Sequence, residues 1–272
     1  MNKQNLNIIC KTIRQDIINS ISSASSGHPG GSLSAVEILS TLYFKEMNID
    51  PADPNNENRD RFVLSKGHAA PVLYATLSNK GFFPKKDLLT LRSLGSKLQG
   101  HPNMNYVPGV DMSTGSLGQG ISTAVGMALA SKIDNKSNRV YCLLGDGELE
   151  EGQVWEAAMC ASHYKLDNLL AIIDFNNLQI DGNIKNVMNP TPIDLKFRAF
   201  GWNVLTVDGH EISSLLDCYE TARTFKGAPT VIIAKTIKGK GVSFMENQAS
   251  WHGTAPNNEQ RETALAEIRE AL

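Results

Sequence analysis

The sequence has few cysteines, and their spacing matches neither a metal site nor a disulfide framework. The four cysteines, Cys10, Cys142, Cys160 and Cys218, are far apart and form no CxxC pair. Cys142 falls in a predicted strand and Cys160 in a predicted helix, so we expect both to be buried free thiols. Reduced cysteines favour a reducing compartment, and we expect a cytoplasmic protein.

Net charge and long apolar runs are also lacking. The 26 Lys and Arg residues nearly balance the 28 Asp and Glu residues, giving a formal net charge of −2. No basic surface for nucleic acid or for a membrane is therefore expected. No apolar run reaches the roughly 18 residues of a transmembrane helix, and residues 1–6 are too polar for a signal peptide. Small-molecule partners are favoured.

What the sequence does contain is an alternation of apolar strands and amphipathic helices. Its 272 residues, 41% of them hydrophobic, suffice for one large domain with a sizeable core. Strands are predicted at residues 61–64, 140–144, 169–173, 203–207 and 230–236. We see no internal repeat and no second domain. The prediction is an α/β fold over residues 1–272, a parallel sheet with helices on both faces and an N-terminal helical segment.

The predicted helices follow from apolar spacing of three and four residues. They cover residues 4–22, 34–44, 71–79, 85–94, 120–130, 154–161, 211–223 and 258–272. Ser34 and Glu37 form a capping box in this interpretation, and acidic residues at 148, 150 and 151 precede the helix at 154–161.

The stretch from residue 139 to residue 177 is the centre of the chain, because it contains a complete strand–helix–strand unit. The first strand ends at Asp146 and the second at Asn176. Parallel neighbouring strands point their carboxyl ends the same way, so these side chains should emerge together at the ligand-binding edge of the sheet. Carboxylate and amide oxygens suit Mg²⁺, which completes its shell with phosphate oxygens. Either dipeptide, Asp-Gly or Asn-Asn, could alone be a simple turn, but their joint placement favours a metal–diphosphate site.

Four histidines lie in loops or at element junctions. His28 lies between Gly27 and Pro29, where a stiff backbone can hold a side chain in place. His68 follows the strand at 61–64, His101 repeats the Gly-His-Pro pattern, and His252 follows Trp251. A single loop histidine is more often a surface residue than a catalytic one.

Two glycine-rich segments allow more than one interpretation. Residues 113–120 open a helix of small residues but do not match the dinucleotide-binding fingerprint. This segment could hold an anion at the helix N-terminus, or its glycines could allow close helix packing. The basic loop at 238–241 is equally compatible with a solvated turn and with a phosphate contact.

Together these motifs resemble the transketolase group of thiamine diphosphate enzymes, over essentially the whole length but only over its N-terminal, diphosphate-binding domain. The matching segments are SGHPGG, DRFVLSKGHA, GHP, TGSLGQGIS, GDG with the later Asn176, and WHG, in that family's order. One departure is Ser116, where transketolases commonly have Pro.

The resemblance implies a role for each candidate residue. Asp146, Asn176 and the main-chain carbonyl of Leu178 would hold Mg²⁺. Cofactor contacts would come from His68, Gly115, Leu117, Gly147, Asn176 and His252. His28 and His101 would bind sugar hydroxyls and move protons, and His252 would also reach the reacting centre.

The implied function is that of the N-terminal subunit of a split transketolase of the pentose phosphate pathway. It would transfer a two-carbon ketol unit between sugar phosphates with Mg²⁺ and thiamine diphosphate. The family's pyrimidine-binding domain carries the activating glutamate, and nothing in this chain corresponds to it. We therefore expect a separate C-terminal subunit and two copies of each. One alternative is a subunit of a related synthase making 1-deoxyxylulose 5-phosphate; another is a non-catalytic, cofactor-binding regulatory subunit.

Overall fold

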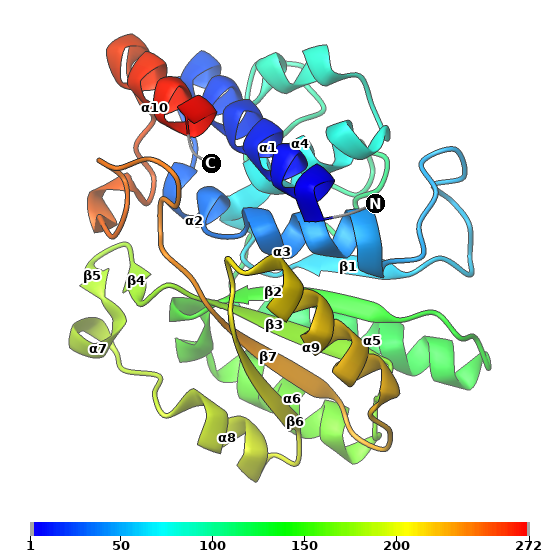
Figure 1. Ribbon diagram of the computed structural model, residues 1–272. Coiled ribbons are helices and arrows are strands. Elements are labelled where there is room, and N and C mark those ends of the chain that lie inside the picture. Colours follow the sequence, from blue (N-terminus) through cyan, green and yellow to red (C-terminus); the bar gives the residue numbers. More distant parts are fainter. Residues whose placement is uncertain (1–2, 271–272) are drawn as a thin grey trace.

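The fold is built on a five-stranded parallel sheet, as the alternating pattern predicts (Figure 1). The computed structural model describes residues 3–270. The strand order is β1-β2-β3-β7-β6. The strands are β1 (Arg61–Leu64), β2 (Val140–Gly145), β3 (Leu169–Phe175), β6 (Asn203–Asp208) and β7 (Thr230–Lys235). Their positions confirm the five predicted strands to within two residues at each end.

Helices cover both faces of this sheet, because alternate strand residues face opposite sides. In β2, Tyr141 and Leu143 pack on one side, whereas Val140, Cys142 and Leu144 pack on the other. The first core contains residues of α1 (Lys3–Ala24), α3 (Val36–Thr41), α4 (Ala70–Lys80), α9 (Ile212–Thr224) and α10 (Asn258–Glu270). The second contains residues of α5 (Gln119–Ile133), α6 (Gly152–His163) and α8 (Ile193–Ala199).

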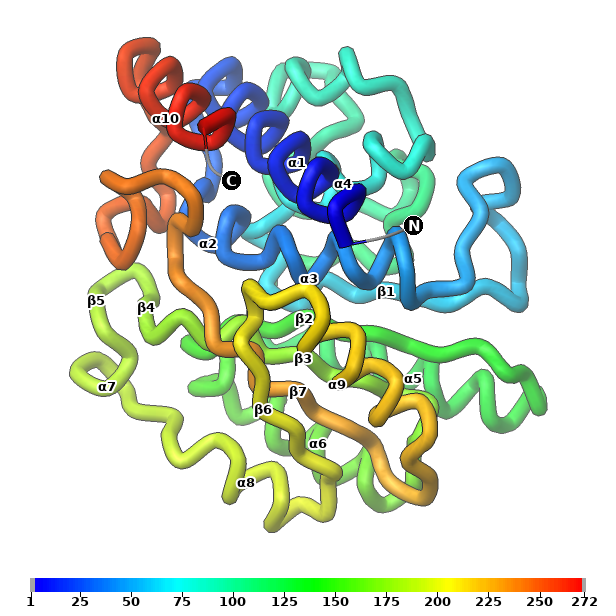
Figure 2. The backbone as a smooth tube through the Cα atoms, in the orientation of Figure 1, coloured from blue at the N-terminus to red at the C-terminus, as the bar shows by residue number. Residues whose placement is uncertain are grey.

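The two ends of the described chain lie on the same side of the molecule. Figure 2 shows α10, in red, running beside α1, in blue. Arg261 of α10 donates to the Oδ1 atom of Asn19 in α1 across 2.9 Å. The predicted C-terminal helix is confirmed as far as Glu270, and residues 271–272 lie outside the described part.

Several local predictions are wrong, and tertiary contacts of Ser34 and Glu37 explain the first of them. Ser34 does not cap a helix from 34 to 44: α2 (Pro29–Leu33) precedes it, and a π-helix, η1 (Leu42–Glu46), follows α3. Its hydroxyl donates to Asp174 instead, and Glu37 pairs with Arg14. The predicted helix at 85–94 is a short 3₁₀ helix, η3 (Lys85–Thr90).

The cysteines are free, but Cys160 is only partly buried, contrary to expectation.

Other short elements complete the chain. A short hairpin, β4 (Leu178–Gln179) and β5 (Gly182–Asn183), α7 (Ile184–Val187) and α8 were not predicted. The remaining 3₁₀ helices are η2 (Gly67–Ala69), η4 (Gly147–Glu150) and η5 (Ala249–Trp251).

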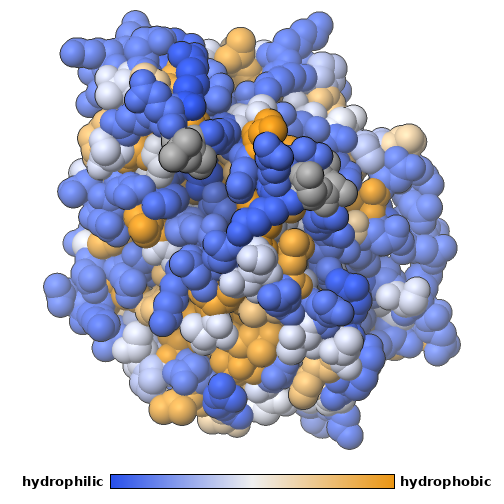
Figure 3. Space-filling model, viewed as in Figure 1, coloured by the Kyte–Doolittle hydropathy of each residue, from blue (hydrophilic) through white to orange (hydrophobic). Residues whose placement is uncertain are grey.

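The surface seen in Figure 3 is mostly hydrophilic, with hydrophobic residues gathered mainly over its lower half. Within residues 3–270, no helix combines the length and the hydropathy that crossing a membrane requires.

Candidate cofactor-binding site

A cavity of about 250 Å³ lies at the carboxyl edge of the sheet. Every candidate residue from the sequence lines it: His28, His68, His101, Gly115, Leu117, Asp146, Gly147, Asn176, Leu178 and His252. Their segments are widely separated in the sequence, so the fold alone brings them together. A larger cavity of about 600 Å³, lined by residues of the 82–108 region, contains none of them.

One end of the cavity is formed where β2 and β3 terminate side by side. The parallel register pairs Gly145 with Asp174, so Asp146 and Asn176 emerge next to each other as predicted. The carboxylate of Asp146 accepts hydrogen bonds from the main-chain N–H groups of Gly147, at 2.9 Å, and Asn177, at 2.5 Å. It is 2% exposed. Burial, and then the nearby Asp174 carboxylate, raise the pKa of Asp146 to about 7.

Asn176 and Leu178 follow on the tight turn after β3. The Oδ1 atom of Asn176 accepts from the N–H of Leu178 at 3.1 Å, and Asn177 between them has a positive φ of 66°. This local turn brings an amide oxygen and a main-chain carbonyl to the same cavity as the Asp146 carboxylate. Within residues 3–270, no three His, Cys, Asp or Glu side chains gather as a possible metal site. A cation here would therefore use these mixed oxygen donors and an added anion.

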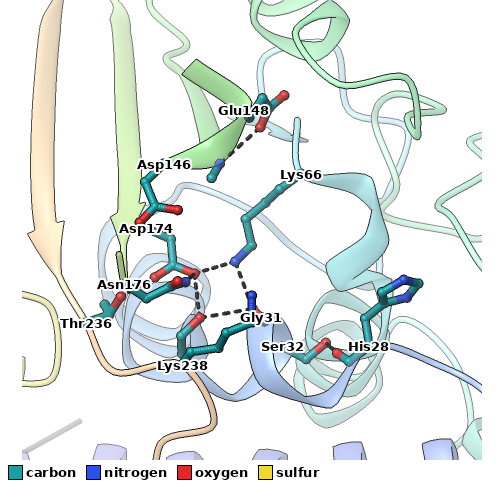
Figure 4. A network of polar contacts seen from close by, with 12 residues as sticks. His28, Gly31, Ser32, Lys66, Asp146, Glu148, Asp174, Asn176, Thr236 and Lys238 are labelled. Atoms are coloured by element: carbon teal, nitrogen blue, oxygen red, sulfur yellow. Dashed lines mark hydrogen bonds and ion pairs between the residues drawn. The ribbon is translucent and has the colours of Figure 1, made fainter. Parts of the chain in front are cut away.

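A buried ion pair supports the floor of the site (Figure 4). The ammonium of Lys66, which is 1% exposed, contacts the fully buried carboxylate of Asp174 and donates to the carbonyl of Gly31 at 2.8 Å. Asp174 also accepts from the hydroxyls of Ser34 and Thr236. Burial opposes ionisation of Asp174, but the Lys66 ammonium lowers its pKa below the usual value.

Lys238 supplies a second buried ammonium, so the loop at 238–241 is not a solvated turn at this position. Lys238 is 2% exposed and lines the cavity. Its Nζ donates to the carbonyl of Leu178 at 3.0 Å and to Nδ1 of His252 at 2.8 Å. Burial, and then the charge of Lys66, lower the pKa of Lys238 to about 8. Its contact with a carbonyl and a neutral imidazole leaves its charge available to an anion.

The four candidate histidines form one cluster. Ring centroids of His28 lie 5.4 Å from His68, 5.5 Å from His252 and 6.4 Å from His101. Burial is the main cause that lowers the pKa of His28 to about 4 and that of His252 to about 3. It also lowers the pKa values of His68 and His101. At neutral pH these rings are uncharged and can accept protons. Nδ1 of His28 is buried and has no partner within residues 3–270.

The glycine-rich loop is bound to Glu148 beside the cavity. The main-chain N–H of Gly118 in this loop donates to the Glu148 carboxylate, so it is not free to bind an anion. The Glu148 carboxylate, 2% exposed, accepts from the N–H of Gly118 at 2.9 Å, the N–H of Gly145 at 3.0 Å and the hydroxyl of Ser65. Glu148 thus belongs to the site wall, and α6 begins only at Gly152. A Cβ on Gly120 would lie 2.6 Å from Cα of Ser65, so close packing is a real function of this loop.

Gly115 also lines the cavity, where it packs against the ring of His101. Its φ is +152°, and a Cβ added there would lie 3.2 Å from the His101 ring, so this position is restricted to glycine. The neighbouring side chain of Leu117 is 36% exposed.

Lys66, Asp174 and Glu148 were not identified from the sequence as residues of this region, and Lys238 was left open between a solvated turn and a phosphate contact. One signal was present: Asp174 is the one charged residue of the otherwise apolar strand β3, and a carboxylate buried there requires a cationic partner. The identity of that partner depends on the fold, because Lys66 is 108 positions away.

Comparison with known proteins agrees with this geometry. Residues 6–270 match the family described as "Transketolase, thiamine diphosphate binding domain". The 6-deoxy-6-sulfo-D-fructose transketolase subunit SqwG of Clostridium sp. (strain MSTE9) is 46% identical over 94% of this chain and 93% of its own length. An apulose-4-phosphate transketolase subunit of Phocaeicola vulgatus is 42% identical over 100% of this chain and 96% of its own length.

A solved structure extends the similarity to three dimensions. Transketolase from Campylobacter jejuni superposes with a TM-score of 0.93 at 36% identity, over 99% of this chain but only 43% of its own. A thiamine diphosphate-binding α/β domain is thus the class that fold and site define. The chain belongs to the transketolase family, as its thiamine diphosphate-binding domain.

Proposed function

We propose that this chain is the N-terminal subunit of a two-subunit transketolase, which transfers a two-carbon ketol unit between sugar phosphates. The observation that supports this most directly is the single cavity that joins the oxygen donors at the β2 and β3 ends to four neutral histidines. The two relatives named above are themselves transketolase subunits of similar length.

The oxygen-rich end of the cavity fits a Mg²⁺–diphosphate group. Asp146 is a buried carboxylate whose pKa is raised by burial and by the neighbouring Asp174 carboxylate, and a divalent ion at this position would favour its charged form. Asn176 and the carbonyl of Leu178 would complete the protein's share of the ligands. Lys238 would neutralise diphosphate oxygens, and Gly147, which lines the cavity, would lie against that group.

The histidine end would act on the sugar. Bound thiamine diphosphate supplies the electron sink for breaking and forming the carbon–carbon bond. His28 and His101 would hold the sugar hydroxyls and exchange protons with them, because neutral imidazoles both accept and donate. His68 and His252 would contact the cofactor, with His252 also close to the reacting carbon. Gly115 and Leu117 would contact the cofactor from the glycine-rich loop.

The partner in this proposal is a C-terminal subunit that carries the pyrimidine-binding domain and its activating glutamate. Two copies of each subunit would form the enzyme, in the cytoplasm and within pentose phosphate metabolism. Since the cofactor would lie between subunits, its binding and the assembly should reinforce each other by mass action.

Calorimetry tests the cofactor site. Thiamine diphosphate should bind the chain together with its partner only when Mg²⁺ is present. Binding that does not depend on Mg²⁺ would contradict the proposed ligand set. Products formed with pyruvate as donor would instead support the synthase alternative, which the transketolase relatives do not favour. Unchanged turnover in His101→Ala within the assembled complex would support the non-catalytic alternative.

A further inference from the structure

The segment at 236–241 carries Lys238 from the end of β7 into the cavity. Before Lys238, the N–H of Thr236 donates to the carbonyl of Phe175 at 3.0 Å, and the carbonyl of Lys238 itself accepts from the N–H of Asn247 at 2.9 Å. The N–H of Gly239 donates to the carbonyl of Gly30 at 3.0 Å, and Gly239 itself has a φ of +80°, where an added Cβ would lie 2.4 Å from the carbonyl oxygen of Met245. The direction of the Lys238 side chain therefore depends on what fixes its neighbours.

His210 fixes the residue immediately before Lys238. Its Nε2 accepts a hydrogen bond from the N–H of Ile237 at 2.8 Å, and its Nδ1 lies 2.9 Å from Oε2 of Glu37. A main-chain N–H is only a donor, so Nε2 must present its lone pair. The ring proton is consequently on Nδ1 and is donated to the Glu37 carboxylate.

Arg14 completes the arrangement by reaching the residue two positions after Lys238. Its guanidinium binds both oxygens of Glu37, at 2.6 Å and 2.8 Å, and its Nε donates to the carbonyl of Lys240 at 3.1 Å. Burial would raise the pKa of Glu37, but Arg14 and then His210 lower it to about 2, so the carboxylate stays charged. Hydrogen bonds thus run without a gap from Ile237 through His210, Glu37 and Arg14 to Lys240.

We propose that His210 is a positioning residue, which together with Glu37 and Arg14 fixes the 237–240 backbone so that the Lys238 ammonium points into the cavity. These three side chains are not among the described residues that line the cavity, so their effect would pass through the backbone. The benefit for diphosphate binding rests on the proposed function, whereas the placement of Lys238 does not.

Chemical labelling of the cofactor-free full chain tests the placement. Acetylation of each lysine by acetic anhydride is followed by mass spectrometry in the wild type, His210→Phe and His210→Gln. Phe fills the space of the ring but cannot accept from Ile237. Gln can accept from Ile237 through Oε1 and donate to Glu37 through Nε2.

Lys238 should be labelled about tenfold faster in His210→Phe, as expected for the loss of one well-formed hydrogen bond. Gln should restore most of the protection. Lys66 is the internal control, because it is similarly buried but is held by Asp174. The proposal is overturned if Lys238 stays protected in His210→Phe, or if Lys66 and Lys238 become labelled together.

A binding measurement separates this inference from the proposed function. In the presence of Mg²⁺, His210→Phe should weaken thiamine diphosphate binding about tenfold, similar to the effect of removing outer partners of a metal site. The same substitution should cost nothing further in a Lys238→Gln background, whereas an equal cost in both backgrounds would indicate general destabilisation and overturn the proposal. Unchanged affinity in Lys238→Gln alone would contradict the diphosphate role of Lys238, and labelling would then decide the positioning role.

Discussion

The ammonium of Lys238 donates to the main-chain carbonyl of Leu178 at 3.0 Å, although the two residues are 60 positions apart in the sequence. This carbonyl is also the proposed third protein ligand of Mg²⁺. A lysine and a metal ion would repel each other at this carbonyl, so with Mg²⁺ bound the Lys238 ammonium would be expected to contact the diphosphate instead.

This relationship predicts effects of opposite sign for Lys238→Met. Without diphosphate, the variant should bind Mg²⁺ about tenfold more tightly, because a competing charge is gone. With thiamine diphosphate, it should bind about tenfold more weakly, because a charge-assisted hydrogen bond is lost. Calorimetry under both conditions measures the two effects. Lys240→Met is the matched control, and a change of the same sign in both conditions would contradict this account.

Asp146→Asn tests the metal site. The substitution keeps the size of the side chain but removes the only carboxylate among the proposed ligands, so Mg²⁺-dependent binding of thiamine diphosphate should fall at least about tenfold. Titrations at fixed cofactor and varied Mg²⁺ would show this. Asp181→Asn, in the exposed turn beyond β4, should behave as the wild type. Normal Mg²⁺ dependence in the Asp146→Asn variant would rule out Asp146 as a ligand.

Lys66→Met should destabilise the fold by about 3–5 kcal/mol, because the fully buried Asp174 would lose its counter-ion. Urea unfolding followed by circular dichroism measures this loss. Adding Asp174→Asn should recover part of it, since the amide needs no counter-ion, its oxygen can still accept from one of the Ser34 and Thr236 hydroxyls, and its NH2 group can donate to the other. A cost below about 1 kcal/mol for Lys66→Met would mean that the pair does not hold the floor of the site.

Burial of His28 and His252 should make the cofactor-free chain less stable as the pH falls below about 6.5, where unfolded histidine takes up protons, an effect that the raised pKa of Asp146 opposes. The folded pKa of His28 is about 4 and that of His252 about 3, so over this range the unfolded state binds more protons. Melting temperatures at pH 7.5 and 5.0 should therefore differ less in His28→Asn than in the wild type. His163→Asn, on the exposed end of α6, should leave the difference unchanged.

The part of the site that could be predicted depends on local patterns. Apolar runs located β2 and β3, and the parallel pairing of such strands was enough to place Asp146 beside Asn176. Glycine and proline neighbours marked His28 and His101 as loop residues with fixed backbones. Resemblance to a known family then gave these positions their expected roles.

The rest depends on contacts between distant segments. Glu37 matches a capping pattern locally, yet burial beside Arg14 and His210 gives it another role. Glu148 lies in an acidic stretch typical of a helix N-terminus, but its carboxylate is buried and accepts a hydrogen bond from the hydroxyl of Ser65. No spacing rule predicts such pairs, because charged side chains become buried only where the fold supplies a partner.

Reconstitution tests the central claim most directly. Ketol transfer between sugar phosphates is measured for the purified chain alone, for a C-terminal subunit with a pyrimidine-binding domain alone, and for their mixture, each with Mg²⁺ and thiamine diphosphate. The account predicts activity only in the mixture and its loss with Asp146→Asn. Full activity of the isolated chain, or an active mixture that tolerates Asp146→Asn, would contradict it.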